Sequence, residues 1–114
     1  MSYSGAEKEM HERLEKMTEL PQMYAGSGYD WDDFNSWYDP EARIFYWGQA
    51  SGCSCNHFWD DFSSLGDFQT GRKEDLLRAA KEWADSNFSY KYSELSKEDY
   101  NAFTAAVRAI KVAA

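Results

Sequence analysis

The chain of 114 residues carries a formal net charge of −8, and 18% of its residues are aromatic. This length is typical of one domain that buries a core of its own, so we expect a single domain over residues 1–114. With 43% hydrophobic residues but no apolar run of about 18, the composition argues against disorder and against a membrane-spanning helix. The charged first residues do not resemble a signal peptide, and we expect a cytoplasmic protein with reduced cysteines and no membrane contact.

The first predicted element is a helix over residues 4–20. Its apolar side chains recur at helical spacing, Ser4 and Glu7 fit a capping box, and Pro21 ends it. The methionines of this apolar stripe could adapt to a partner, but a stripe that packs on its own domain is the simpler interpretation. Residues 22–30, rich in glycine, are expected to form a linker or a first short strand.

A β-hairpin is predicted over residues 31–49, with arms at about 33–38 and 43–49. Its turn is the Asp-Pro-Glu-Ala sequence at residues 39–42. Both faces of the arms carry large aromatic side chains, whereas a strand with one wet face would alternate apolar and polar residues. Either helices cover both faces or one aromatic face is exposed to a partner, and the three predicted helices favour coverage.

Small and polar side chains dominate residues 48–57, which predicts a tight loop in which Gly52 can adopt a positive φ. Residues 58–69 follow as a short helix or an irregular segment, two alternatives that the pattern leaves open.

Two further helices are predicted over residues 72–86 and 97–111, from apolar stripes and from carboxylates in their first turns. Asn87 is the expected C-cap of the first helix and Ser96 the N-cap of the second, and residues 88–92 alternate as a short extended piece would. The elements together predict an α+β fold: a small antiparallel hairpin or sheet packed by an N-terminal helix and two C-terminal helices.

Cys53, Cys55 and His57 form a C-x-C-x-H pattern of soft ligands that suit Zn²⁺. A structural zinc site needs four ligands and usually separates its cysteines by more residues, so two small side chains packed in a tight loop are the simpler interpretation. A cysteine nucleophile with histidine as its base would lack a third group to orient the pair. We therefore assign no catalytic residue, no metal and no cofactor.

The middle of the chain is both its acidic and its aromatic part. Between Gln22 and Gln69, eight carboxylates face one base, Arg43, for a charge of −7, and this stretch holds 13 of the 20 aromatic residues. Such a surface repels phosphate, so we expect no direct contact with nucleic acid and a basic protein partner instead. Tryptophan is a favoured anchor at protein interfaces. The candidate partner-binding residues are Trp37, Trp47, Trp59, Asp32, Asp33, Asp60 and Asp61.

Three short motifs follow one another in this region: Phe45-Tyr46-Trp47, Ser51-Gly52-Cys53-Ser54-Cys55 and Phe58-Trp59-Asp60-Asp61-Phe62. With them, residues 29–68 resemble an uncharacterised family of small actinobacteriophage proteins, whose members carry an aromatic strand, an S-G-C-S-C core and a following F-E/D-D stretch. Ala50 and Asn56 stand where many members have aspartate and proline. The resemblance implies a phage origin and expression in the host cytoplasm, and it implies no activity.

We therefore expect a phage-encoded accessory protein that is not an enzyme and that acts through protein–protein interaction. Its partner would be a protein of the host or of the phage, such as a host enzyme or a defence factor, and spaced carboxylates could present a mimic of DNA to a basic host protein. Two alternatives stay open: a small metal-binding or thiol-dependent enzyme that uses the C-x-C-x-H loop, and a virion or assembly component.

Overall fold

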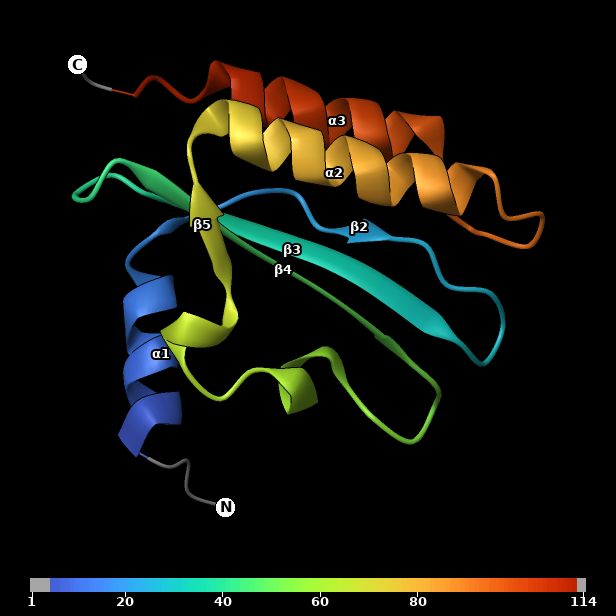
Figure 1. Cartoon of the computed structure of the whole chain (residues 1–114), viewed down its shortest axis with the longest axis horizontal. Helices are drawn as coiled ribbons and strands as arrows, with labels where there is room; N and C mark the ends of the chain where they lie inside the picture. Colours follow the sequence, from blue (N-terminus) through green and yellow to red (C-terminus); the bar gives the residue numbers. More distant parts are fainter. Residues whose placement is uncertain (1–4, 113–114) are drawn as a thin grey trace.

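The computed structural model describes residues 5–112 and confirms the α+β class, with helices packed on a five-stranded antiparallel sheet (Figure 1). Ser4, the expected cap of the first helix, lies outside the described residues. Among residues 5–112, no helix is both long and apolar enough to cross a membrane. The elements in chain order are α1 (Gly5–Glu15), β1 (Thr18–Glu19), β2 (Met23–Tyr24), β3 (Trp31–Asp39), β4 (Ile44–Gly52), the 3₁₀ helices η1 (Phe58–Asp61) and η2 (Leu65–Asp67), β5 (Gln69–Gly71), α2 (Lys73–Phe88) and α3 (Lys97–Ala109).

The β3–β4 hairpin is the centre of the sheet. Its turn lies where it is predicted and is held by Asp39, whose Oδ1 accepts hydrogen bonds from the backbone N–H groups of Glu41 and Ala42 at 2.9 and 3.2 Å. β1 and β2 both pair with β3, and β5 pairs with residues 45–47 of β4. Each of the other strands therefore pairs with one strand of the hairpin.

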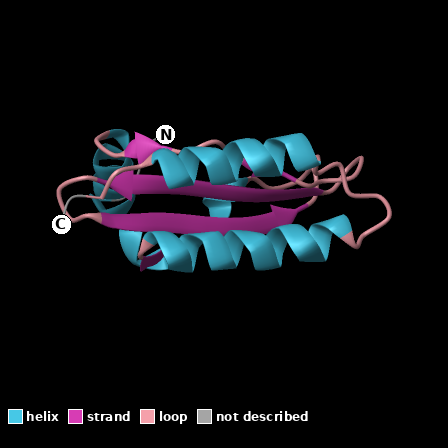
Figure 2. Ribbon diagram, turned by 90° about the horizontal axis from the view of Figure 1, so that it is seen from above, coloured by secondary structure: helices cyan, strands magenta, loops and turns pink. Residues whose placement is uncertain are grey.

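The sheet separates two layers. α2 and α3 lie side by side on one face, and α1, η1 and η2 lie on the other (Figures 1 and 2). Because successive side chains of a strand point to opposite faces, β3 contributes side chains to the cores on both sides of the sheet. Phe34 and Tyr38 join the core beneath α2 and α3, whereas Trp37 joins the core beneath α1 and the 3₁₀ helices. Both aromatic faces of the hairpin are therefore covered, which is the alternative that the three predicted helices favoured.

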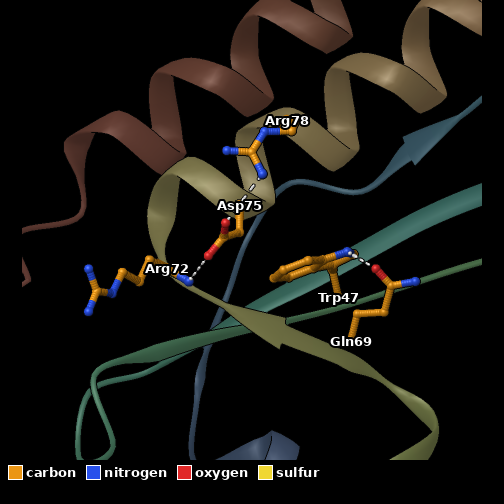
Figure 3. Close-up of polar contacts among 5 residues, drawn as sticks. All are labelled: Trp47, Gln69, Arg72, Asp75 and Arg78. Atoms are coloured by element: carbon orange, nitrogen blue, oxygen red, sulfur yellow. Dashed lines mark hydrogen bonds and ion pairs between the residues drawn. The ribbon is translucent and has the colours of Figure 1, made fainter.

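The core beneath α2 and α3, which we call the helix-side core, is built on aromatic rings. The ring centroid of Phe34 lies 5.6 Å from that of Trp83 in α2 and 5.7 Å from that of Phe103 in α3. Trp47 is buried between β4 and α2, and its indole Nε1 donates to Gln69 Oε1 at 3.0 Å (Figure 3). Each large side chain buried in this way contributes roughly 1.5–3 kcal/mol, so these rings stabilise the docking of both helices.

The opposite core, which we call the loop-side core, joins α1 to the two 3₁₀ helices. Phe62 stacks on Phe68 with their ring centroids 4.4 Å apart, and both rings lie over Gly48 of β4. A Cβ atom on Gly48 would come within 2.7 Å of Phe62 Cζ and 2.9 Å of Phe68 Cδ1. Glycine is therefore needed here to let the aromatic rings approach the strand.

Two predicted boundaries in the first half of the chain are wrong. The first helix ends at Glu15, not at residue 20, because Thr18 and Glu19 leave it to pair with β3. The loop expected from residue 48 begins only after Gly52, because residues 48–52 pair with β3 and extend β4. Gly52 does not have the expected positive φ; an added Cβ would instead lie 2.3 Å from Asn56 Oδ1.

The C-terminal helices follow the prediction more closely. The first turn of α2 is held by Asp75, whose Oδ2 accepts the backbone N–H of Arg72 at 2.9 Å (Figure 3). Asn87 lies inside α2 rather than at its C-cap, which is Ser89, and the piece expected to be extended over residues 88–92 is the end of α2 followed by a turn. Ser96 is confirmed as the N-cap of α3, since its side chain accepts the backbone N–H of Asp99 at 3.0 Å.

Candidate functional site

The two hairpin tryptophans proposed as partner-binding residues lie inside the molecule. Trp37 and Trp47 are each 5% exposed, and they lie in the loop-side and the helix-side core respectively. The register explains the separation: Trp37 is opposite Tyr46, so Trp47, one position further along β4, points to the other face. Little of either indole is therefore open to a partner. Trp59 of η1, in contrast, is 39% exposed.

The aspartates of the predicted set are also divided. Asp32 lies beneath α2, where its Oδ1 accepts a hydrogen bond from Trp83 Nε1 at 2.9 Å. Asp33, the next residue of β3, lies on the opposite face of the sheet beside tryptophan side chains. Asp60 accepts a backbone N–H at the start of η1 at 2.8 Å and so caps that turn, while Asp61 is exposed. Asp33 is thus the member of the set that lies with Trp37 and Trp59 on the loop-side face.

The loop after β4 presents both thiols to solvent. Trp31 Nε1 donates to the carbonyl oxygens of Cys53 and Asn56, at 2.8 and 3.1 Å, and attaches the loop to β3. A hydrogen bond between the thiols lowers the pKa of Cys53 and raises the pKa of Cys55. Within residues 5–112, no three or more histidine, cysteine or acidic side chains are grouped to hold a metal ion, so His57 does not complete a metal site with the thiols.

Three tryptophans and two carboxylates meet in a cleft on the loop-side face of the sheet, which we call the indole cleft. Alternate residues of β3 line it, namely Trp31, Asp33, Asn35 and Trp37, and Trp59 lines it from η1. Its volume is about 400 Å³, and the ring centroids of Trp37 and Trp59 are 6.0 Å apart. The cleft gathers three members of the predicted set, adds Trp31, and leaves out the other four.

A smaller hollow of about 350 Å³ adjoins the indole cleft on the side of α1. Both are lined by Glu19, Trp37 and Trp59, so Glu19 of β1 stands at their junction. α1 adds Glu15 and His11, whose ring centroid lies 4.7 Å from that of Trp59. Among the described residues that line the two hollows, three are Asp or Glu and none is Lys or Arg. The site is therefore aromatic and anionic, which suits a cationic ligand.

Asp33 is the partly buried carboxylate of this site. Burial raises its pKa, the charge of Asp32 adds to the rise, and a hydrogen bond with the side chain of Gln22 opposes it. Its Oδ1 is buried and has no hydrogen-bond partner within the described part of the chain. Native proteins keep few such atoms, because each costs on the order of 1–3 kcal/mol. Asp33 thus places a carboxylate with incomplete hydrogen bonding in the wall of the cleft.

Trp31, Glu19 and Gln22 are site residues that the sequence analysis missed. Trp31 begins an alternation of period two with Asp33, Asn35 and Trp37, and this signal could have placed it on the same face. Glu19 and Gln22 carried no such signal. They reach the cleft because the chain reverses after α1 and pairs with β3, which depends on contacts distant in sequence.

The basic residues gather elsewhere. A separate cavity of about 590 Å³ lies where the hairpin turn, the start of α2 and the end of α3 meet. Lys73 Nζ donates there to the backbone carbonyl oxygens of Arg108 and Ile110, which neutralises the carbonyl end of α3. Five of the 12 basic residues line this cavity: Arg43, Arg72, Lys73, Arg108 and Lys111.

The comparison with known proteins identifies a family. The family model described as domain of unknown function DUF7574 matches residues 6–112, and the chain therefore belongs to the DUF7574 family. No curated protein and no solved structure shows significant similarity to the chain. The expectation of an uncharacterised family is thus confirmed, while the phage origin and the S-G-C-S-C motif as a family feature stay predictions.

Proposed function

We propose that this DUF7574 protein is a protein-binding module that receives a basic segment of its partner in the indole cleft. The lining supports the proposal, since the cleft and the hollow beside it hold three indoles and three carboxylates and no Lys or Arg among the described lining residues. Basic side chains are attracted both to indole faces and to carboxylates. The net charge of −8 would also speed the encounter with a basic partner.

In its finer form, the proposal is a phage-encoded accessory protein that acts in the host cytoplasm on a basic host protein, such as an enzyme or a defence factor. The resemblance carried by the S-G-C-S-C region and the acidic middle of the chain support this form. If the basic surface of the partner is its own DNA-binding site, the protein acts as a mimic of DNA. Duplex DNA would then displace the protein from its partner. If the protein instead binds another surface of the partner, DNA would not affect the complex.

Trp59→Ala is the variant that tests the proposed function. Trp59 is 39% exposed, whereas truncation of the buried Trp37 or Trp47 would damage the core. We expect immobilised peptides rich in Lys and Arg to retain the wild-type protein, and Trp59→Ala to weaken this binding by about tenfold, since anchor residues of interfaces often contribute ~1–2 kcal/mol or more. Tyr92→Ala removes a ring that is 62% exposed and does not line the cleft, and serves as the matched control.

Two results would overturn the proposal. In one, the basic peptides fail to bind the wild-type protein. In the other, they bind the wild-type protein and a folded Trp59→Ala variant equally, which would indicate attraction to the net charge alone. Circular dichroism and thermal unfolding establish beforehand that both variants are folded.

A further inference from the structure

We infer that the group bound in the indole cleft is the guanidinium of an arginine side chain. This inference rests on the proposed function and specifies its ligand. It starts from Asp33, whose carboxylate side chain lines the cleft and whose Oδ1 is buried without a hydrogen-bond partner in the described part of the chain. An acceptor of this kind needs a donor that can leave water at little cost.

The surroundings of Asp33 show why that donor comes from outside the fold. The side chain of Gln22 forms a hydrogen bond with the carboxylate, but Oδ1 stays unpaired. Across the hairpin, Asp33 is opposite Ala50, whose side chain has no donor, and across β2 it is opposite Tyr24, whose hydroxyl donates to the backbone carbonyl of Asp30 at 3.5 Å. On the same strand and the same face, its neighbours are Trp31 and Asn35. The indole N–H of Trp31 is already bonded to the carbonyl oxygens of the thiol loop.

The chemistry of the lining favours guanidinium over ammonium. A guanidinium is planar and weakly hydrated, stacks on aromatic faces, and carries five N–H donors in a fixed plane. One edge can donate to the Asp33 carboxylate while its face lies against indole, and the carbonyl oxygen of the Asn35 side chain offers a further acceptor. An ammonium is strongly hydrated and would lose more of its hydration on entering a site of three indoles.

The five tryptophans can serve as NMR probes that report where a ligand binds. Each gives its own indole N–H signal in heteronuclear NMR spectra, and the chain has two outside the cleft that serve as internal controls, Trp47 and Trp83. The titrant is the peptide N-acetyl-Gly-Arg-Gly-amide, with its lysine and citrulline analogues as matched ligands. Citrulline keeps the shape of arginine and removes its charge.

We expect the arginine peptide to shift the signals of Trp31, Trp37 and Trp59 and to leave those of the two control tryptophans in place. Its affinity should exceed that of the lysine and citrulline peptides by about tenfold, the size of one charge-assisted hydrogen bond. Asp33→Asn should remove this preference. Asp61→Asn makes the same change of charge on an exposed residue outside the lining, and should alter affinity by less than about twofold.

The outcomes separate this inference from the proposed function. If lysine and arginine peptides bind equally and both depend on Trp59, the proposed function holds and the guanidinium inference is wrong. If the arginine peptide shifts all five indole signals or none, or if folded Asp33→Asn keeps the preference, the inference is also overturned. Glu19→Gln supplies a second variant at the junction of the two hollows, and it should weaken the arginine peptide without unfolding the protein, because Glu19 is exposed.

Discussion

At the scale of single residues, the consecutive acids Asp32 and Asp33 receive opposite environments. Asp32 accepts a hydrogen bond from Trp83 and so ties β3 to α2, whereas Asp33 keeps an unpaired buried oxygen beside Trp31. An ionised carboxylate at Asp33 does not stabilise the fold, because burial raises its pKa. A residue that breaks the rules of local stability is expected at a functional site rather than at a structural one.

Asp33→Asn is therefore expected to make the protein more stable while it weakens binding. The raised pKa of Asp33 means that the folded state holds its proton more tightly than the unfolded chain, whose pKa lies near 3.8. The ionised form thus destabilises the fold at pH values above the folded pKa, and this cost disappears as the pH falls through it. At pH 7 we expect a gain of about 1 kcal/mol, because the neutral amide avoids the cost of burying a charge, and this cost is reduced since the carboxylate is only partly shielded from water.

Urea unfolding at a series of pH values from 7 downward measures this gain, which should shrink as the pH falls through the raised pKa of Asp33. Asp61→Asn, on an exposed carboxylate, should show little gain at any of these pH values. An Asp33→Asn variant that is less stable than wild type at pH 7 would show that the carboxylate supports the fold.

At the scale of elements, the second half of β4 is a strand built from small residues, and its packing shows why. Residues 48–52 contain no bulky side chain, a composition typical of a loop, yet they pair with β3 along their whole length. Small side chains leave room for the segment after β4 to fold back over the sheet, where Phe62 and Phe68 pack on Gly48. This packing positions η1, and with it Trp59, beside β3.

Gly48→Ala is expected to destabilise the protein by about 1–3 kcal/mol, because the new methyl group would overlap two aromatic rings that belong to a packed core. Gly66→Ala is the matched control, since the nearest atom to its added Cβ, Ser64 Oγ, is 3.6 Å away. Chemical denaturation should give a near-neutral value for the control. Equal effects of the two substitutions would contradict the close packing over Gly48.

At the scale of the whole molecule, two aromatic cores share one hairpin and two charge regions lie apart. β3 and β4 send alternate side chains into both cores, so neither core can lose its strands without exposing the other. The carboxylates beside the indole cleft and the basic cavity between α2, α3 and the hairpin turn are separate sites. The proposed binding of a cationic group would therefore take place away from the basic cavity, where Lys73 bonds the carbonyl end of α3.

Because the cores share the hairpin, we expect residues 1–114 to unfold as one cooperative unit. Tryptophan fluorescence reports both cores, since Trp37 and Trp47 lie in different ones, and far-ultraviolet circular dichroism reports the helices and strands. The two signals should give the same midpoint in a urea titration. Distinct midpoints would instead indicate that the two sides of the sheet unfold separately.

Local patterns in the sequence were enough to determine the classes of the main elements. The apolar stripes of α2 and α3, the N-cap Ser96 and the turn that begins at Asp39 act over a few residues, so their signals can be read directly. The same patterns singled out Trp59 and Asp33, because an acidic and aromatic stretch is unusual wherever it folds. They also predicted correctly that helices would cover the hairpin.

Only the tertiary structure decided which of these residues form a site. Alternation along a strand shows that neighbouring side chains point apart, but the register that sends Trp37 and Trp47 to different cores is set by pairing across the hairpin. The indole cleft combines side chains of β1, β3 and η1, from Glu19 to Trp59, with His11 and Glu15 of α1 beside it. Its position depends on how the segment after β4 packs back over the sheet, and long-range packing of that kind leaves no periodic signal in the chain.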